Sequence, residues 1–116
     1  MKFYVDGNYF LNFDGNFPKT KKSAILAAWE KWQTIVKFHK DNPDVYSVYN
    51  IHANTCALCQ LYLNGTECFK CPIYKATGEH LCQNTPYVDY MNAATPEDKL
   101  YFARKEAKFI KSLLKK

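Results

Sequence analysis

The chemistry-bearing residues of this 116-residue chain are five cysteines gathered in its middle. Cys56 and Cys59 form one Cys-x-x-Cys pair, Cys68 and Cys71 form a second, and Cys82 follows soon after. A two-residue gap lets both thiolates of a pair face one ion from a tight turn, and two pairs supply the four sulfurs of a tetrahedral zinc site. The spacing therefore predicts a bound Zn²⁺ that ties this part of the chain together.

The set of ligands stays open among the five cysteines and a nearby histidine. One possible set comprises both pairs: Cys56, Cys59, Cys68 and Cys71. Cys82 either replaces one of them or lies beside the metal, and His80 is also within reach. His39, near the end of a predicted helix, is interpreted as a partly buried residue whose charged form the helix dipole favours, ahead of a ligand role.

Two other chemistries compete with zinc. Cysteine pairs followed by proline, as in Cys71-Pro72, also hold 4Fe-4S clusters, so an iron-sulfur protein with a redox or sensing role is the main alternative. Thiol-disulfide exchange is a third reading, and it needs a thiol of low pKa, typically at the start of a helix. Neither pair clearly precedes a helical pattern in the sequence, which disfavours this reading.

The first residues lack the apolar run of a secretion signal, and no segment approaches the roughly 20 apolar residues that span a bilayer. We therefore expect a cytoplasmic protein without a membrane partner. Thiols stay reduced in the cytosol, and five cysteines cannot all pair within one chain. Both points favour metal binding over structural disulfides.

Several elements can be predicted around the cysteines. Residues 2–5 and 9–13 are strand-like, and the intervening Asp6-Gly7-Asn8 is typical of a tight hairpin turn. Apolar residues recur with helical period over about 21–40, with Lys31 among the residues assigned to the other faces. Thr95-Pro96-Glu97-Asp98 has the composition of a helix start, and this second helix is predicted over about 96–114. Residues 44–54 fit either a strand or a helical turn.

These elements predict an α+β fold in one domain, residues 1–116. A short N-terminal β-hairpin and two amphipathic helices would pack on a cysteine-rich metal-binding loop or hairpin region. A hairpin that turns at Asn64-Gly65 would bring the two cysteine pairs side by side. A chain this short gains little margin from hydrophobic burial, so a metal would add needed stability.

The last predicted helix carries a basic face, and the chain has a net charge of +5. The basic face consists of Arg104, Lys105, Lys108, Lys111 and Lys115. Such a face is usually only solvated, but it also suits an acidic partner or non-specific nucleic-acid binding. Arg104 is the only arginine in the sequence, which argues against sequence-specific reading of bases.

The sequence lacks the parts of an enzyme. It contains neither the deaminase pattern of His-x-Glu with a downstream Pro-Cys-x-x-Cys nor a nucleotide-binding glycine loop. A catalytic zinc usually keeps an open position, whereas a site made only of thiolates is normally closed and structural. We therefore predict a non-catalytic protein.

The motifs resemble a group of small cysteine-rich proteins encoded by bacteriophages and prophages. The resemblance rests on Cys56-Ala-Leu-Cys59, Cys68-Phe-Lys-Cys71-Pro72 and Cys82-Gln-Asn-Thr85-Pro86-Tyr87, with a closing helix. It implies a phage origin and a shared metal-bound core, and it brings no activity with it. The prediction is a zinc-stabilised interaction module that engages an unknown protein partner of the host or phage, in the host cytoplasm if it is phage-encoded.

Overall fold

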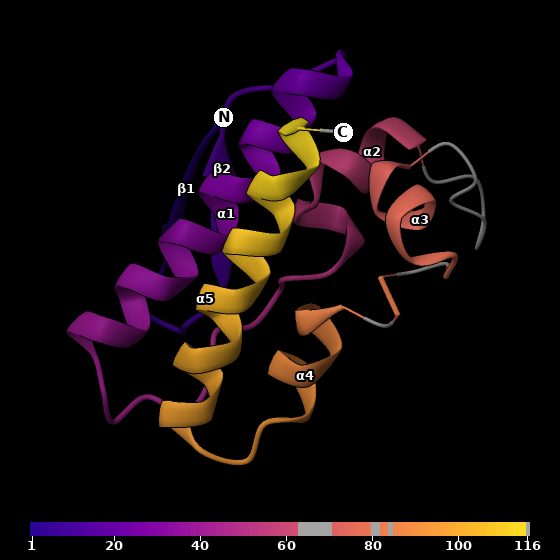
Figure 1. Ribbon diagram of the computed structural model, residues 1–116. Coiled ribbons are helices and arrows are strands. Elements are labelled where there is room, and N and C mark those ends of the chain that lie inside the picture. Colours follow the sequence, from indigo (N-terminus) through magenta and orange to yellow (C-terminus); the bar gives the residue numbers. More distant parts are fainter. Residues whose placement is uncertain (63–70, 80–81, 84, 116) are drawn as a thin grey trace.

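The computed structural model describes residues 1–62, 71–79, 82–83 and 85–115, which form an antiparallel β-hairpin and five α-helices (Figure 1). The elements in chain order are β1 (Lys2–Val5), β2 (Leu11–Asp14), α1 (Lys21–Asp41), η1 (Ala53–Thr55), α2 (Ala57–Tyr62), α3 (Pro72–Thr77), α4 (Pro86–Asn92), α5 (Pro96–Ser112) and η2 (Leu113–Lys115). The predicted α+β class is confirmed.

The N-terminal hairpin is confirmed, with its turn built differently from the prediction. The Asp6 carboxylate accepts backbone N–H groups from Asn8 at 2.8 Å and from Phe10 at 3.1 Å. The left-handed backbone falls at Tyr9, whose φ is 66°. β2 consequently begins at Leu11 and not at residue 9.

The undecided segment 44–54 lies against this hairpin. The N–H of Leu11 donates to the carbonyl of Tyr49 at 2.8 Å, and the N–H of Tyr49 donates to the carbonyl of Tyr9 at 2.8 Å. An isolated parallel bridge joins Phe10 to Tyr49, and the segment then enters η1. The hairpin therefore anchors this segment at Tyr49, ahead of η1 and the first cysteine.

The two long helices begin as the sequence predicts. The Thr20 side chain accepts the N–H of Ser23 to cap α1, and the Thr95 side chain accepts the N–H of Asp98 to cap α5. Pro96 occupies the first turn of α5, where its missing N–H costs nothing. α5 is shorter than predicted, because it ends at Ser112 and continues as the single turn η2.

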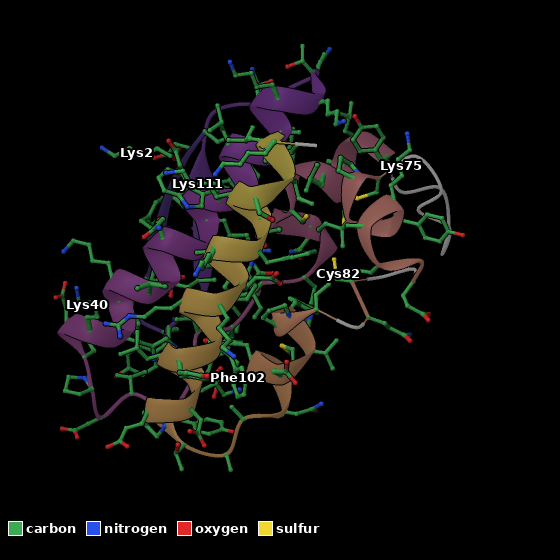
Figure 2. The ribbon with its side chains drawn as sticks, viewed as in Figure 1. Lys2, Lys40, Lys75, Cys82, Phe102 and Lys111 are labelled. Carbon is green, nitrogen blue, oxygen red and sulfur yellow. The ribbon has the colours of Figure 1, made fainter. Side chains whose placement is uncertain are left out.

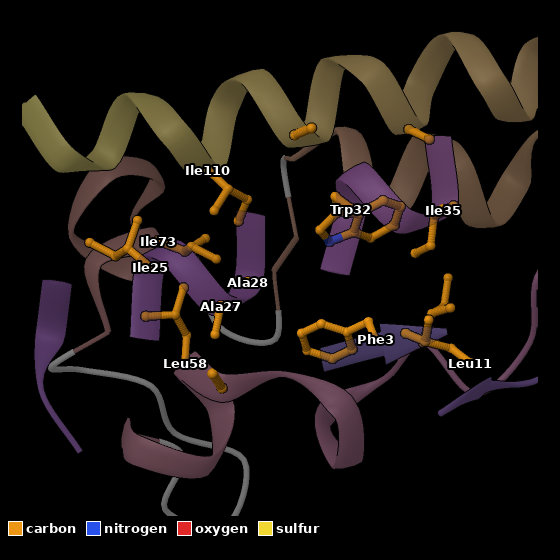
Figure 3. Close-up of a cluster of buried hydrophobic side chains, with 14 of the residues drawn as sticks. Phe3, Leu11, Ile25, Ala27, Ala28, Trp32, Ile35, Leu58, Ile73 and Ile110 are labelled. Carbon is orange, nitrogen blue, oxygen red and sulfur yellow. The ribbon is translucent and has the colours of Figure 1, made fainter. Parts of the chain in front are cut away.

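The core lies where α1 packs along α5, with the hairpin on one side and the short helices on the other (Figures 1 and 3). Trp32 and Ile35 enter it from α1, Ile110 from α5, and Leu58 from α2. Because Leu58 lies between Cys56 and Cys59, the first cysteine pair adjoins the main core.

The prediction of two helices on a cysteine-rich loop was wrong for this middle region. The described cysteines are connected by the short helices α2 and α3, and α4 follows them. The predicted turn at Asn64-Gly65 lies outside the described residues. Among the helices that are described, none is long and apolar enough to cross a membrane.

Candidate metal centre and adjoining cavity

Four cysteines surround one small void. Cys56 immediately precedes α2, Cys59 lies in its first turn, Cys71 caps α3, and Cys82 lies between α3 and α4 (Figure 2). All four line a void of about 10 Å³, together with Leu58, Ile73, Tyr74 and Glu79. This volume is close to that of a single small occupant.

Local backbone geometry brings the cysteines to the void. Pro72 fixes the first turn of α3 directly after Cys71, and Gly78 ends α3 with a φ of 77°, which glycine adopts without steric cost. Cys82 has a φ of 61°, in the left-handed region that L-residues rarely occupy. The chain is therefore bent sharply on both sides of residues 80 and 81.

Cys56 and Cys59 interact directly. The backbone N–H of Cys59 donates to the Cys56 Sγ at 3.4 Å. A hydrogen bond from the Cys59 side chain lowers the pKa of Cys56 to about 6, helped by the nearby Lys31 ammonium and opposed by burial. The same contact and burial raise the pKa of Cys59, so the proton of the pair resides on Cys59. Cys56 is thus the thiol that ionises first.

The helix positions overturn one premise of the sequence analysis. Cys56 directly precedes α2 and Cys71 directly precedes α3, so both pairs do adjoin helix starts. The sequence hid these helices because each has only six residues, too few to show a helical period. Thiol-disulfide chemistry at Cys56 and Cys59 is therefore more plausible than the sequence indicated.

The structure brings Cys56, Cys59, Cys71 and Cys82 to one void, while Cys68 and His80 lie outside the described residues. Within the described part of the chain, no group of three or more His, Cys, Asp or Glu side chains is arranged tightly enough to hold an ion. A metal site made of the described thiols alone would therefore require them to move closer together.

A larger cavity of about 240 Å³ adjoins this void. Its described lining comes from all five helices and from the residues before η1: Ala28, Lys31, Trp32, Ile51, His52, Cys56, Cys59, Ile73, Cys82, Tyr87, Glu106 and Ile110. The walls are mostly apolar, so the few polar groups among them determine its chemistry. Cys56, Cys59 and Cys82 border both spaces.

Lys31 is buried in the wall of this cavity, although the sequence analysis placed it off the apolar face of its helix. It is 2 % exposed, and its ammonium donates to the carbonyl oxygen of Ile51 at 2.6 Å. Burial lowers the pKa of Lys31, whereas ionised Cys56 and Cys59 would raise it. The helical period could have predicted the burial of Lys31, because position 31 lies on the same stripe of the helix as Ala28 and Ile35, which are buried.

Glu106 is the second residue that the sequence analysis missed. It is 1 % exposed, and its Oε1 has no hydrogen-bond partner among the described residues. Burial raises the pKa of Glu106 from 4.5 to about 8, while the Lys31 ammonium partly offsets this effect. Its position between Ala103 and Ile110 on α5 places it on the buried stripe.

Tyr87 and His52 close another side of the cavity. The Tyr87 hydroxyl and the His52 Nδ1 are 2.5 Å apart, and the Tyr87 ring meets the edge of Trp32 at a centroid distance of 6.0 Å. Burial is the main cause that raises the pKa of Tyr87. Tyr87 therefore remains a neutral hydroxyl on the wall of the cavity at physiological pH.

His39 takes part in a separate buried contact. Its Nε2 lies 2.8 Å from the Tyr90 hydroxyl, and it is 2 % exposed. Burial, assisted by the charge of Lys99, lowers the pKa of His39 from 6.5 to about 4. The expectation of a histidine held in its charged form by the helix dipole was therefore wrong.

The predicted basic face is present on α5 and η2. Its exposed members are Arg104, Lys105, Lys108, Lys111 and Lys115. Lys105 lies over the Tyr101 ring at 4.7 Å, and Lys111, which is labelled in Figure 2, lies over the Trp29 ring at 4.6 Å. Two of these lysines thus pack on aromatic rings of the chain itself, and nucleic-acid binding stays a prediction.

Comparison with known proteins adds no relative on which a function could be based. No family model, curated protein or solved structure matches the chain.

Proposed function

We propose that this chain is a small non-catalytic interaction module whose cysteine cluster binds one zinc ion. Cys56, Cys59 and Cys82 supply ligands, and Cys71 or Cys68 completes the set. The single observation that carries the proposal is the convergence of four cysteines on a void of about 10 Å³. Four cysteines placed by chance in a core would have no reason to share so small a space.

The buried Lys31 supports a site with several thiolates. Four thiolates around Zn²⁺ leave a net charge of about −2, which is costly to bury unless a positive group lies nearby. Ionised Cys56, Cys59 and Cys82 each favour the ammonium form of Lys31. Burial of the Lys31 ammonium in an apolar wall costs desolvation free energy, and this burial is explained if the ammonium offsets the negative charge of the zinc–thiolate site.

The ion would join parts of the chain that are otherwise held weakly. α2 and α3 have six residues each, which is too short for helices to be stable alone. Zinc binding contributes about 10–16 kcal/mol in small zinc-finger peptides, as much as the whole stability of a typical domain. Metal binding would therefore be coupled to folding of the middle region.

An exposed aromatic group next to the hairpin supports the interaction role. Tyr9, Phe10, Tyr46 and Tyr49 are each more than two-fifths exposed, and the Phe10 and Tyr49 rings lie 5.9 Å apart. Exposed aromatic side chains that gather on one surface are typical of protein interfaces. We infer a cytoplasmic role with a protein partner, of host or phage origin.

The test compares the purified protein with Cys56→Ser and with Ala57→Ser as the matched control. Ala57 is fully buried beside Cys56, so its variant introduces the same hydroxyl without removing a sulfur. We expect one zinc per chain and a colourless solution for the wild type and for Ala57→Ser. Cys56→Ser should lose the metal and most of its cooperative melting.

Other outcomes would refute the zinc assignment. A brown protein with iron and acid-labile sulfide would establish the iron-sulfur alternative. If the wild-type protein contains no metal and a strong chelator leaves its melting curve unchanged, the proposal of any bound metal is refuted.

A dithiol redox couple is the second candidate, favoured by the contact of Cys56 with Cys59 at the start of α2. The Cys56 thiolate would attack a substrate disulfide, and the Cys59 thiolate would then release the substrate dithiol and form a Cys56–Cys59 disulfide. The substrate gains two electrons and the cysteine pair loses two. Oxidised glutathione should then consume two thiols in a metal-free, folded protein, whereas zinc-bound thiols should resist it.

A further inference from the structure

The cavity of about 240 Å³ is lined by two buried ionisable groups, one basic and one acidic, that do not form an ion pair with each other. Lys31 is 2 % exposed and Glu106 is 1 % exposed. Among the described residues, Lys37 with Asp41 is the ion pair within 4.0 Å. Lys31 and Glu106 therefore face the same cavity without closing on each other.

Both groups retain capacity to bind something in the cavity. An ammonium has three donors, and among the described residues that of Lys31 donates a hydrogen bond to the carbonyl oxygen of Ile51 and lies 5.8 Å from the centre of the Trp32 ring. The Glu106 Oε1 is buried and has no partner within the described part of the chain. A buried carboxyl oxygen without a partner costs free energy, and a ligand donor is one way to satisfy it.

Water alone fits this space poorly. The cavity corresponds to the liquid volume of about eight water molecules, and each buried water needs two to four polar partners. The walls between the polar groups are formed by Ala28, Trp32, Ile51, Ile73 and Ile110. Such walls suit a ligand with an apolar body and one polar end.

We propose that this cavity binds a small uncharged amide of about eight to ten non-hydrogen atoms, whose N–H donates to Glu106 and whose carbonyl accepts from Lys31. An uncharged ligand is favoured because an anionic ligand would lie beside the Glu106 carboxyl and a cationic ligand beside the Lys31 ammonium, so either charge would face an unfavourable neighbour. An amide supplies the required donor and acceptor on one group. The proposal goes beyond the zinc module and does not require the metal.

Benzamide is the probe, and ethylbenzene is its apolar counterpart of similar size. Binding to the full purified chain is measured by calorimetry and by the indole N–H signals of the two tryptophans. Trp32 lines the cavity and Trp29 does not, so benzamide should shift the Trp32 signal alone. Metal content is measured on the same samples, so a failure of the zinc proposal is recorded separately.

Two variants and two matched controls identify the polar contacts. Lys31→Met and Glu106→Leu should each weaken benzamide binding at least tenfold. Lys22→Met, on the exposed side of α1, and Glu97→Leu, on the exposed first turn of α5, should leave it unchanged. If Glu106→Leu does not fold, the comparison of Lys31→Met with Lys22→Met decides the question.

Three results would overturn the proposal. The first is the absence of saturable benzamide binding to the wild type. The second is ethylbenzene binding as tightly as benzamide, which would make the cavity an apolar void without polar recognition. The third is unchanged benzamide affinity in both Lys31→Met and Glu106→Leu.

Discussion

Acidification should destabilise the protein through His39, and the size of the effect follows from its environment. Its pKa falls from 6.5 in the unfolded chain to about 4 in the folded protein, mainly because it is buried. Between these values the unfolded state binds more protons, so folding stability is present above pH 6.5 and is lost as the pH falls towards 4. At about 1.36 kcal/mol for each pKa unit, the full loss is about 3 kcal/mol, and about 2 kcal/mol is already lost at pH 5.

Urea unfolding at pH 7 and pH 5 measures this effect. His39→Gln removes the titrating ring, so its stability should fall by about 2 kcal/mol less than that of the wild type over this interval. His52→Gln, at an exposed histidine, is the matched control and should keep the wild-type loss. Loss of a bound metal at acid pH would affect all three proteins and cancel in the comparison. Equal losses in the wild type and in His39→Gln would refute the reasoning.

Three further substitutions test other parts of the account. Cys82→Ser should release the metal and abolish cooperative melting if Cys82 is a ligand, whereas a folded variant with full zinc content would place it beside the site. Glu106→Leu should raise the free energy of unfolding in urea by about 1–3 kcal/mol, because it removes a buried carboxyl oxygen without a partner, and a destabilised variant would reveal a structural role. Gly78→Ala should lower the melting temperature, since it costs about 1 kcal/mol at a φ of 77°, and an unchanged melting curve would show that the end of α3 adapts.

The long helices and the hairpin could be predicted because their signals are local. Thr95 and Pro96 start α5 through hydrogen bonding and a fixed φ that do not depend on the rest of the fold. The helices α2 and α3 could not be predicted in the same way. Each is six residues long, and packing of residues such as Leu58 and Ile73 into the common core stabilises them.

The polar part of the site was missed for a related reason. The sequence analysis placed Lys31 off the apolar face and did not single out Glu106, and most lysines and glutamates are indeed exposed. Their burial depends on partners from distant segments, such as the Ile51 carbonyl that accepts from Lys31 at 2.6 Å. The cysteine spacing predicted that Cys56, Cys59 and Cys71 share one ion; the three side chains line one void, and their binding of an ion stays a prediction.

The zinc K-edge X-ray absorption spectrum of the purified chain tests the central claim most directly. The account predicts one zinc per chain with a first shell dominated by sulfur at about 2.3 Å. A chain without zinc, or a zinc shell made only of nitrogen and oxygen at about 2.0 Å, would contradict the proposal that these cysteines hold the ion.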